Sequence, residues 1–520
     1  MTWSLEFKAQ LRDPNPPTPV FVVSPVKLAL NEGPSSTYSV ASHPGLGPSD
    51  LIADGSVEIL GQSVDTVQFS SRLGGFGFQL RDPINMALAS WVRGMLLELR
   101  MGWPGWALDD FQTIAIGQLK AITGPGPLWS VECWDLWAAL ESRITWTVAQ
   151  HGLFYNVMAS TVVATSDYSS GGGTLTVAST SGFQRETGGK FVVRVTANDG
   201  DQFYLIATAS TGTTFTINPT SGQFDTTADD ADEDQVVEEV AYLSGHPRDI
   251  FRRVLASTGA GSNGSYDDYP KSWGYAIPDA YLDHQDLARF SQVIASARVW
   301  DLIAPMDMQD SAGDATGEVP SGWAWLQDRF AVAGVWPVVH EGQLSLRAAQ
   351  DITSQGIHTT GEVITDDDII EVTGQQIWAD SHPIEYASLV INWVGGQENR
   401  ADTVATLPSV ASLRRNGFDE DTTSLNFLDE NGAIDVCARC LYWLTRVPER
   451  LTVMLRGLHW MRLVPGDVVD YEGTRTTSRK GAREGLAIIS RQAMVTQVNP
   501  SLLSATVEVA LEFLPEWAGE

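Results

Sequence analysis

The first group of residues that could do chemistry is the glycine-rich segment Gly259–Gly264, whose spacing matches the dinucleotide-binding pattern GxGxxG. In that pattern a strand precedes the glycines and a helix follows them, so that the phosphates of the nucleotide meet the N-terminus of the helix. Here the helix-like segment His246–Ser257 precedes the glycines, and Tyr266–Pro270 follows them. The order of elements does not fit nucleotide binding, and we interpret the segment as a loop.

The cysteines could supply redox chemistry or zinc ligands. Cys437 and Cys440 are spaced as CxxC within the helix-like segment Asp435–Arg446. Redox use would need a thioredoxin-like βαβ context, and zinc would need a second pair of ligands, which His459 alone does not supply. With Cys133 the chain has only 3 cysteines, so we expect no disulfide framework. We interpret Cys437 and Cys440 as half-buried residues of a helix.

Two acidic runs could bind a cation or supply catalytic carboxylates. The run Asp229–Asp234 does not match a calcium-binding EF-hand loop, which needs a glycine at its sixth position. If the loop starts at Asp230, its sixth residue is Gln235. Asp366–Asp368 is the densest candidate for the carboxylate pair of a glycoside hydrolase, but adjacent acids at the start of a strand are typical of a turn and strand cap. The sequence contains no HExxH, GxSxG or Walker A motif. We therefore predict no catalytic, cofactor-binding or metal-binding residues and no enzyme, with a cell-wall hydrolase as the enzymatic alternative.

Aromatic and basic residues offer two possible binding surfaces. Trp103 and Trp106 could form a platform for a sugar, although loop tryptophans of a β domain more often fill its core or an interface, which is the interpretation that we favour. A group of cations lies between two strand-like runs near the end of the chain, namely Arg475, Arg479, Lys480 and Arg483. These cations form either a solvated hairpin tip or an electrostatic contact with an acidic neighbouring subunit.

The charge of the chain is strongly negative. Its 520 residues include 64 acidic and 33 basic side chains, for a net charge of −31. This balance argues against a surface that grips nucleic acid or docks on anionic lipid, because both need clustered cations. Met1–Val20 contains Glu6, Asp13 and several prolines, which is not typical of a signal peptide, and the chain has no apolar run long enough to span a bilayer. We expect no membrane insertion by this chain.

The elements that would position these residues are mostly short strands. The 47 glycines and 25 prolines, with many runs rich in threonine and valine, favour a β-rich α+β fold with several domains. We predict a loosely packed N-terminal arm (1–50), a first barrel-like β domain (51–150), an inserted small β module (160–242), a central α+β domain with helices and a hairpin (243–350), a connecting region of strands plus a helix (355–445), and a second barrel-like β domain (446–520).

A turn near the end of the chain has a clear local cause. In Leu463–Asp467, Pro465 presets φ, Gly466 tolerates a positive φ, and the side chain of Asp467 can accept a hydrogen bond from nearby backbone. The strand-like run Val468–Tyr471 follows. We interpret the turn as a corner of the second β domain.

Several stretches, taken in order, resemble the tail hub proteins of tailed bacteriophages, which are related to the central baseplate hub of contractile phages. They are Leu73–Phe76, Arg81–Pro83, Asp110–Gly117, Val131–Asp135, His246–Ile250, Tyr266–Pro270, Trp273–Pro278, Gly342–Leu346, Ile364–Ile369, Asn392, Pro448 and Leu463–Asp467. The resemblance depends on this order and covers roughly residues 50–150 and 245–515.

The resemblance implies a structural virion protein without enzymatic activity, assembled in the host cytoplasm and located at the tail tip or baseplate. Such hubs are trimers, and the two barrel-like domains of each chain give a ring of six similar units. The ring would continue the lumen of the tail tube, join the distal tail protein and hold fiber or spike proteins. DNA and the tape-measure protein would pass through it during DNA ejection. A host-binding adhesin that uses Trp103, Trp106 or the inserted module is the other alternative.

Overall fold

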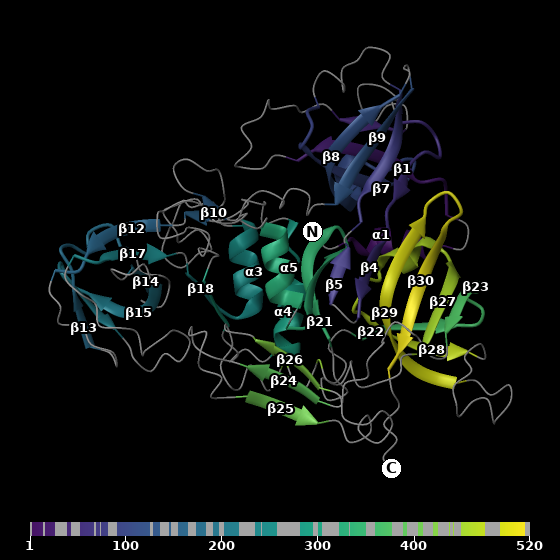
Figure 1. Cartoon of the computed structure of the whole chain (residues 1–520). Helices are drawn as coiled ribbons and strands as arrows, with labels where there is room; N and C mark the ends of the chain where they lie inside the picture. The colour runs from purple at the N-terminus through teal and green to yellow at the C-terminus, as the bar shows by residue number, and fades with distance from the viewer. Residues whose placement is uncertain are drawn as a thin grey trace.

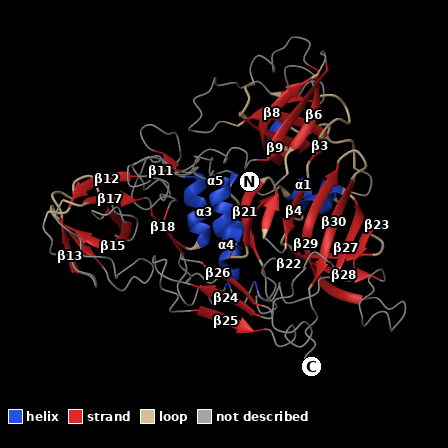
Figure 2. Ribbon diagram, viewed as in Figure 1, coloured by secondary structure: helices blue, strands red, loops and turns tan. Residues whose placement is uncertain are grey.

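A computed structural model describes residues 3–13, 16–26, 39–42, 52–66, 69–72, 74–81, 91–124, 128–135, 145–146, 154–155, 157–164, 173–183, 191–196, 202–217, 234–240, 242–256, 281–294, 300–303, 322–331, 333–349, 359–376, 388–392, 404–408, 420–424, 436, 440, 449–473 and 489–514 of the chain. Over these residues the fold is β-rich with few helices, and most strand pairs are antiparallel (Figure 1 and Figure 2). Within them, no helix is long and apolar enough to cross a membrane.

The first large sheet comes from the N-terminal part of the chain. Its strand order is β2 (Val40–Ala41), β1 (Val20–Pro25), β7 (Leu96–Gly102), β8 (Gln112–Thr123), β9 (Leu128–Asp135), β6 (Phe76–Arg81) and β3 (Glu58–Ile59). Along β6, Phe76, Phe78 and Leu80 are buried and the residues between them are more exposed, because successive side chains of a strand point to opposite faces. In the described residues no ladder joins β2 to β3, so the sheet is open where we predicted a barrel-like domain.

The described part of the predicted N-terminal arm is packed and not loose. Helix α1 (Leu5–Leu11) begins after Ser4, whose hydroxyl accepts a hydrogen bond from the backbone N–H of Phe7 at 3.1 Å. Phe7 and Leu11 are buried in the core of the first sheet, and β1 is one of the strands of that sheet. Burial of these large apolar side chains outweighs the entropy cost of ordering a proline-rich segment.

The inserted module folds around its own core. Its strand order is β12 (Val157–Val162), β17 (Val236–Val240), β14 (Phe191–Thr196), β15 (Gln202–Ser210), β16 (Thr214–Ile217) and β13 (Gly173–Thr176). The sheet is curled, because Val163 and Val177 form a bridge between its two outer strands, and the backbone N–H of Ala164 donates to the carbonyl of Thr176 at 2.9 Å. Buried valines, Leu175 and Phe215 fill the interior. In Figure 1 the module lies to the left of the other sheets.

The central region has the helices and the hairpin that we predicted. Its helices are α3 (Pro247–Ala256), α4 (His284–Val293) and α5 (Gly322–Ala331), and its hairpin is β20 (Val335–His340) with β21 (Gln343–Ala348). Short sheets accompany them: β18 (Tyr242–Gly245) with β19 (Trp300–Ile303), β10 (Thr145–Trp146) with β11 (Phe154–Tyr155), and β25 (Val404–Pro408), β24 (Ser388–Asn392) and β26 (Glu420–Ser424). Of the predicted helix Asp435–Arg446, only Val436 and Cys440 are described, and both are helical.

The second large sheet comes mostly from the C-terminal part of the chain. Its strand order is β22 (Thr359–Thr365), β28 (Val468–Gly473), β29 (Ile489–Ser501), β30 (Thr506–Phe513), β27 (Arg450–Arg456) and β23 (Ile369–Gln376). The outer strands β22 and β23 are consecutive in the chain and joined by the short turn Asp366–Asp368, so the sheet must curl strongly. No ladder closes it into a barrel over the described residues.

A hairpin from the predicted first domain extends this second sheet. Strand β4 (Gln62–Asp65) pairs with β29 and with β5 (Ser70–Arg72). Strands β4 and β5 therefore belong to the second sheet by pairing, although β3 and β6, which flank them in the chain, belong to the first. This hairpin connects the two large sheets, because the chain leaves the first sheet after β3, pairs with the second sheet through β4, and returns to the first sheet at β6.

Candidate functional site

The hairpin β20–β21 lies where the two large sheets and the helical region meet, and we call its surroundings the central junction (Figure 1). Every described side chain of β21 is buried, and so are the first four of β20. The run Val335–Val339 is apolar without alternation, which is typical of a strand that is covered on both faces. The buried hairpin is therefore in a position to connect the two large sheets and the helical region.

A buried arginine connects the hairpin to a helix and to the second sheet. Arg347, 2% exposed, donates through Nε to Asp467 Oδ1 at 2.9 Å, and its Nη1 pairs with a carboxylate oxygen of Asp286 on α4. Burial opposes the charge of Arg347, but the carboxylates of Asp286 and Asp467 outweigh burial and raise the pKa of the guanidinium further above its ordinary value. The arginine therefore stays charged and joins two elements that are far apart in the sequence.

The turn Leu463–Asp467 docks directly on this hairpin. The side chain of Asp467 accepts from the backbone N–H of Val464 at 3.1 Å, as the sequence predicted, and the indole Nε1 of Trp336 donates to the carbonyl of Pro465 at 3.0 Å. Gly466 has φ of +103°. An added Cβ at Gly466 would lie 2.7 Å from Cβ of Arg347 and 2.9 Å from Cζ2 of Trp336, so the contact leaves no space for a side chain. The turn therefore packs against the hairpin β20–β21 in addition to forming a corner before strand β28.

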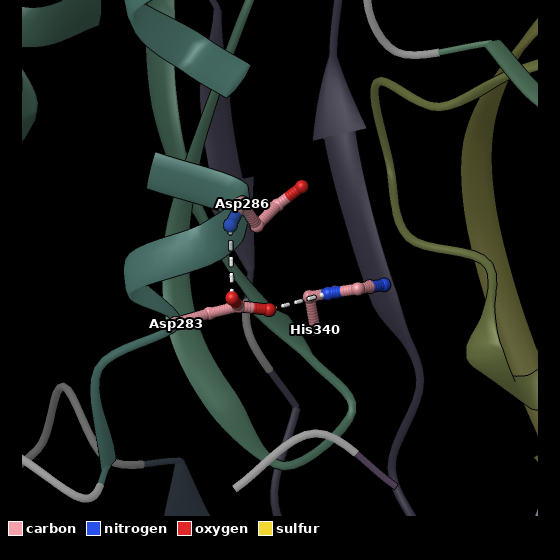
Figure 3. A group of neighbouring side chains, drawn as sticks. All are labelled: Asp283, Asp286 and His340. Carbon is pink, nitrogen blue, oxygen red and sulfur yellow. Dashed lines mark hydrogen bonds and ion pairs between the residues drawn. The ribbon is translucent and has the colours of Figure 1, made fainter. Parts of the chain in front are cut away.

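A second group of charges caps helix α4 (Figure 3). Asp283, the N-cap residue, accepts from the backbone N–H of Asp286 through Oδ1 at 2.9 Å and pairs through Oδ2 with Nδ1 of His340 at 2.8 Å. An aspartate at the N-cap followed three residues later by another acid is a familiar helix start, and this signal was present in the sequence. Sequence analysis nevertheless missed Asp283, Asp286 and His340.

These three side chains could in principle hold a metal ion, because their ligand atoms lie within 4.8 Å of one another. However, both oxygens of Asp283 already accept hydrogen bonds, and Asp286 is paired with the buried guanidinium of Arg347. A divalent cation placed here would lie beside that positive charge in a region of low dielectric constant. We therefore interpret the group as a helix cap joined to an ion-pair network.

The protonation of His340 gives the junction a pH dependence. Burial opposes the imidazolium, but the hydrogen bond to Asp283 and the carboxylates of Asp286 and Asp467 outweigh both burial and the charge of Arg347, and they raise the pKa of His340. A raised pKa in the folded state stabilises the fold fully below the unfolded pKa of about 6.5, and this contribution is lost as the pH rises through the folded pKa.

We expect the free energy of unfolding of the wild-type chain to exceed that of His340→Gln by more at about pH 6 than at about pH 9, because only the wild-type side chain loses a proton in that range. Urea unfolding of both chains at the two pH values measures this difference. Comparing the two chains cancels the effect of His246, whose pKa is lowered mainly by burial and whose contribution has the opposite pH dependence. A difference that is independent of pH would contradict the prediction.

The N-terminal helix and the first sheet meet the tip of the same hairpin. The backbone N–H of Trp3 donates to Oε2 of Glu341 at 3.0 Å, the indole Nε1 of Trp3 donates to the carbonyl of Thr113 on β8 at 2.8 Å, and Lys8 pairs with Glu341 at 2.5 Å. At the tip, an added Cβ on Gly342 would lie 2.2 Å from the carbonyl oxygen of Thr113. The first sheet is therefore in backbone contact with the hairpin.

The hairpin β4–β5 contacts strand β20 of the central junction. The side-chain amide of Gln62 donates to the carbonyl of Val339 at 2.8 Å and accepts from its N–H at 2.9 Å, so one side chain satisfies both backbone groups. The hydroxyl of Ser71 donates to the carbonyl of Pro337 at 3.1 Å. These bonds fix β20 against a hairpin that also pairs with β29.

The structure places some of the residues that the sequence singled out. Trp103 is 3% exposed, and its ring lies 5.0 Å from those of Phe7 and Trp106, which agrees with the core interpretation and not with an exposed sugar platform. In the turn Asp366–Asp368, Oδ2 of Asp368 accepts from the N–H of Thr365 at 2.8 Å, which agrees with a turn and strand cap.

Other predicted residues lie partly or wholly outside the described part of the chain. Cys440 is 3% exposed, so it is buried where we predicted a half-buried helix residue, and Cys437 is not described. Cys133 is also buried, and burial raises the pKa of its thiol. Segments that fall outside the described residues are Gly259–Gly264, Asp229–Glu233 and the cations Arg475, Arg479, Lys480 and Arg483.

Comparisons with known proteins add a distant likeness. No protein-family model matches the chain, and no curated protein does. A 43 kDa prophage tail protein from Shewanella oneidensis has a similar structure, with 8% sequence identity and a TM-score of 0.35 over 94% of this chain and 95% of that one. A tail protein from Neisseria meningitidis has 10% identity and a TM-score of 0.36 over 88% of this chain and 96% of that one.

A prophage tail protein from Listeria monocytogenes has 8% identity and a TM-score of 0.38 over 95% of this chain and 94% of that one. A chain of a native gene transfer agent virion has 12% identity and a TM-score of 0.21 over 45% of this chain and 84% of that one. At these low scores the likeness says nothing about individual residues or partners. The chain is similar, distantly and over most of its length, to phage tail proteins.

Proposed function

We propose that this chain is a structural virion protein that forms a trimeric hub at the distal end of a phage tail, without enzymatic activity. The observation that carries the proposal is the central junction, in which one buried hairpin is bound to the first sheet, to helix α4 and to the second sheet. A hub needs such a connection, because it must keep its shape while neighbouring tail proteins pull on it. The ordered resemblance of the sequence to tail hub proteins supports the same function.

The chemistry of the junction also favours a scaffold. Its carboxylates are used in ion pairs, a helix cap and turn hydrogen bonds, as the contacts of Asp283, Asp286 and Asp467 show. Groups that are fully engaged in holding the fold are poor candidates for general acids or bases, which must be free to reach a substrate. The same holds for Asp368, whose carboxylate caps its own turn.

In this proposal the two large sheets of each chain act as barrel-like units, and three chains form a ring of six units. The ring continues the lumen of the tail tube, joins the distal tail protein and holds fiber or spike proteins, while DNA and the tape-measure protein pass through. The net charge of −31 fits this role, because a lumen lined with carboxylates offers phosphates no site for counterion release.

We expect the purified full-length chain to have three times the mass of one chain in native mass spectrometry and to form rings with threefold symmetry in negative-stain images. Both measurements are needed, because a trimer without a ring would not continue a tube. Dilution to nanomolar concentration serves as the control for non-specific association. A stable monomer at micromolar concentration would contradict the proposed hub.

A further inference from the structure

A polar pocket with a volume of about 790 Å³ lies on one face of the second sheet. Its lining comes from β5, β4, β29, β30, β27 and β23, which are neighbours in that order (Figure 1). One row of directly paired residues crosses all of these strands and lines the pocket, namely Arg72, Ser63, Gln497, Ala510, Thr452 and Gly374. Residues that pair directly project from the same face of a sheet. The pocket is therefore built on the face of the sheet and not between loops.

The polar face of this sheet contains a buried carboxylate. Along β27, Leu451 and Val453 belong to the apolar core. Arg450 and Thr452 alternate with them and so point to the opposite, polar face. Glu512 on β30 pairs directly with Arg450 and lies on the same polar face, where it is 0% exposed. A buried carboxylate destabilises a fold unless a cation compensates it, and Arg450 is that cation.

Two buried partners hold Arg450 in one orientation. Its Nε donates to Oε2 of Glu512 at 3.0 Å, and its Nη2 donates to Oγ1 of Thr66 at 3.1 Å. The hydroxyl of Thr66, which is 1% exposed, donates to the same carboxylate oxygen at 3.1 Å. These bonds use Nε and Nη2, and Nη1 has no acceptor among the residues that the structure describes. The guanidinium is therefore preorganised in the lining of the pocket, with Nη1 available to a ligand.

A second arginine makes the pocket suitable for an anion. Arg72 on β5 is exposed, and its guanidinium makes no ion pair within the described part of the chain. The described lining holds Arg72, Arg450 and Asp65, whereas acids outnumber cations by 64 to 33 in the whole chain. Carboxylates farther away than about 10 Å are largely screened by salt, so the lining decides what the pocket attracts. Guanidinium groups bind carboxylates and phosphates through directional hydrogen bonds.

The rest of the lining suits a ligand with many hydroxyl groups. It includes the amides and hydroxyls of Gln375, Gln376, Gln497, Ser63, Ser70 and Thr452, which can both donate and accept hydrogen bonds. A volume of about 790 Å³ is in the range of small-molecule sites. We propose that the pocket binds an acidic saccharide, whose carboxylate binds Arg72 and Arg450 and whose hydroxyls bind the amides and hydroxyls. The site does not depend on the proposed trimer, since one chain supplies all of it.

Titration of the full chain with D-glucuronate, followed by ligand-observed NMR, tests the site. We expect Arg72→Gln to raise the Kd at least about tenfold, as for the loss of a hydrogen bond to a charged group. Arg456→Gln is the matched control, because Arg456 is exposed on β27 but is not in the lining, and it should leave the Kd unchanged. Arg450→Lys keeps a cation beside Glu512 but removes Nη1, so it should also weaken binding.

A fourth variant separates the space in the pocket from its charge. Gly374→Gln keeps both arginines, and its added Cβ would lie 3.4 Å from the side chain of Thr452, so the new side chain fills the pocket and should abolish binding. Circular dichroism confirms that each variant is folded. No binding by the wild-type chain, or a Kd that Arg72→Gln and Gly374→Gln leave unchanged, would overturn the site.

Other ligands test the chemical class. D-glucose should bind at least about tenfold more weakly than D-glucuronate, because it lacks the carboxylate. Equal binding of glucose would overturn the role of the two arginines. Acetate or inorganic phosphate binding as tightly as glucuronate would show an oxyanion site without recognition of a sugar, and tighter binding of tetraglutamate would assign the pocket to an acidic peptide. Each of these results would overturn the saccharide as the ligand, while the proposed hub would stand.

Discussion

Replacing Arg347 with methionine is expected to lower the free energy of unfolding by about 3–5 kcal/mol, because it removes the cation that compensates the charge of two buried carboxylates. Arg347 is 2% exposed, and the side chains of its partners Asp286 and Asp467 are 5% and 4% exposed. Methionine fills much of the same volume, so the loss of stability measures the effect of the uncompensated charges and not the effect of a cavity. Urea unfolding of the full chain, followed by circular dichroism, measures the effect.

Two further variants show whether the charges are the cause. Arg12→Met removes an ion pair with Glu362 whose arginine side chain is 55% exposed, and we expect it to cost at most about 1 kcal/mol, since solvent screens exposed pairs. Adding Asp286→Asn and Asp467→Asn to Arg347→Met should recover part of the lost stability, because neutral amides are less costly to bury. Equal losses for Arg347→Met and Arg12→Met would contradict the assignment of Arg347 as the connection between helix and sheet.

Gly466→Ala is the second change with a large expected effect, about 3 kcal/mol or more of lost stability, because strain in the backbone adds to a collision with packed side chains. The new Cβ would lie 2.7 Å from Cβ of Arg347 and 2.9 Å from Cζ2 of Trp336, and neither neighbour can move without breaking its own hydrogen bonds. The midpoint of urea unfolding should fall accordingly.

Gly105 provides the matched control for Gly466. Its φ of +91° is close to the +103° of Gly466, but an added Cβ at Gly105 meets no atom within 4 Å. Gly105→Ala should therefore show the backbone strain alone, about 1 kcal/mol. If the two alanine variants lost the same stability, the close packing of the turn against the hairpin would play no part, and the junction would not depend on this contact.

The local elements at the junction could be predicted from the sequence. We predicted a hairpin within the central domain (243–350), and the structure has it at Val335–His340 and Gln343–Ala348. An apolar run, a Glu-Gly turn and a second apolar run are enough to specify such a hairpin, since each signal lies within a few residues of the next. The packing of the N-terminal segment was not predicted, because its prolines and serines are typical of a loose arm while its partners lie far along the chain.

The sequence by itself determined the β-rich composition, the turn at Pro465–Asp467 and the helix–hairpin order of the central region. Only the tertiary structure decided what these elements touch. Arg347 and its partners are 61 and 120 residues apart, and Gln62 and Val339 are 277 residues apart. Periodicity and turn chemistry act over a few neighbouring residues, whereas these contacts depend on how whole sheets pack, so no local pattern could identify them.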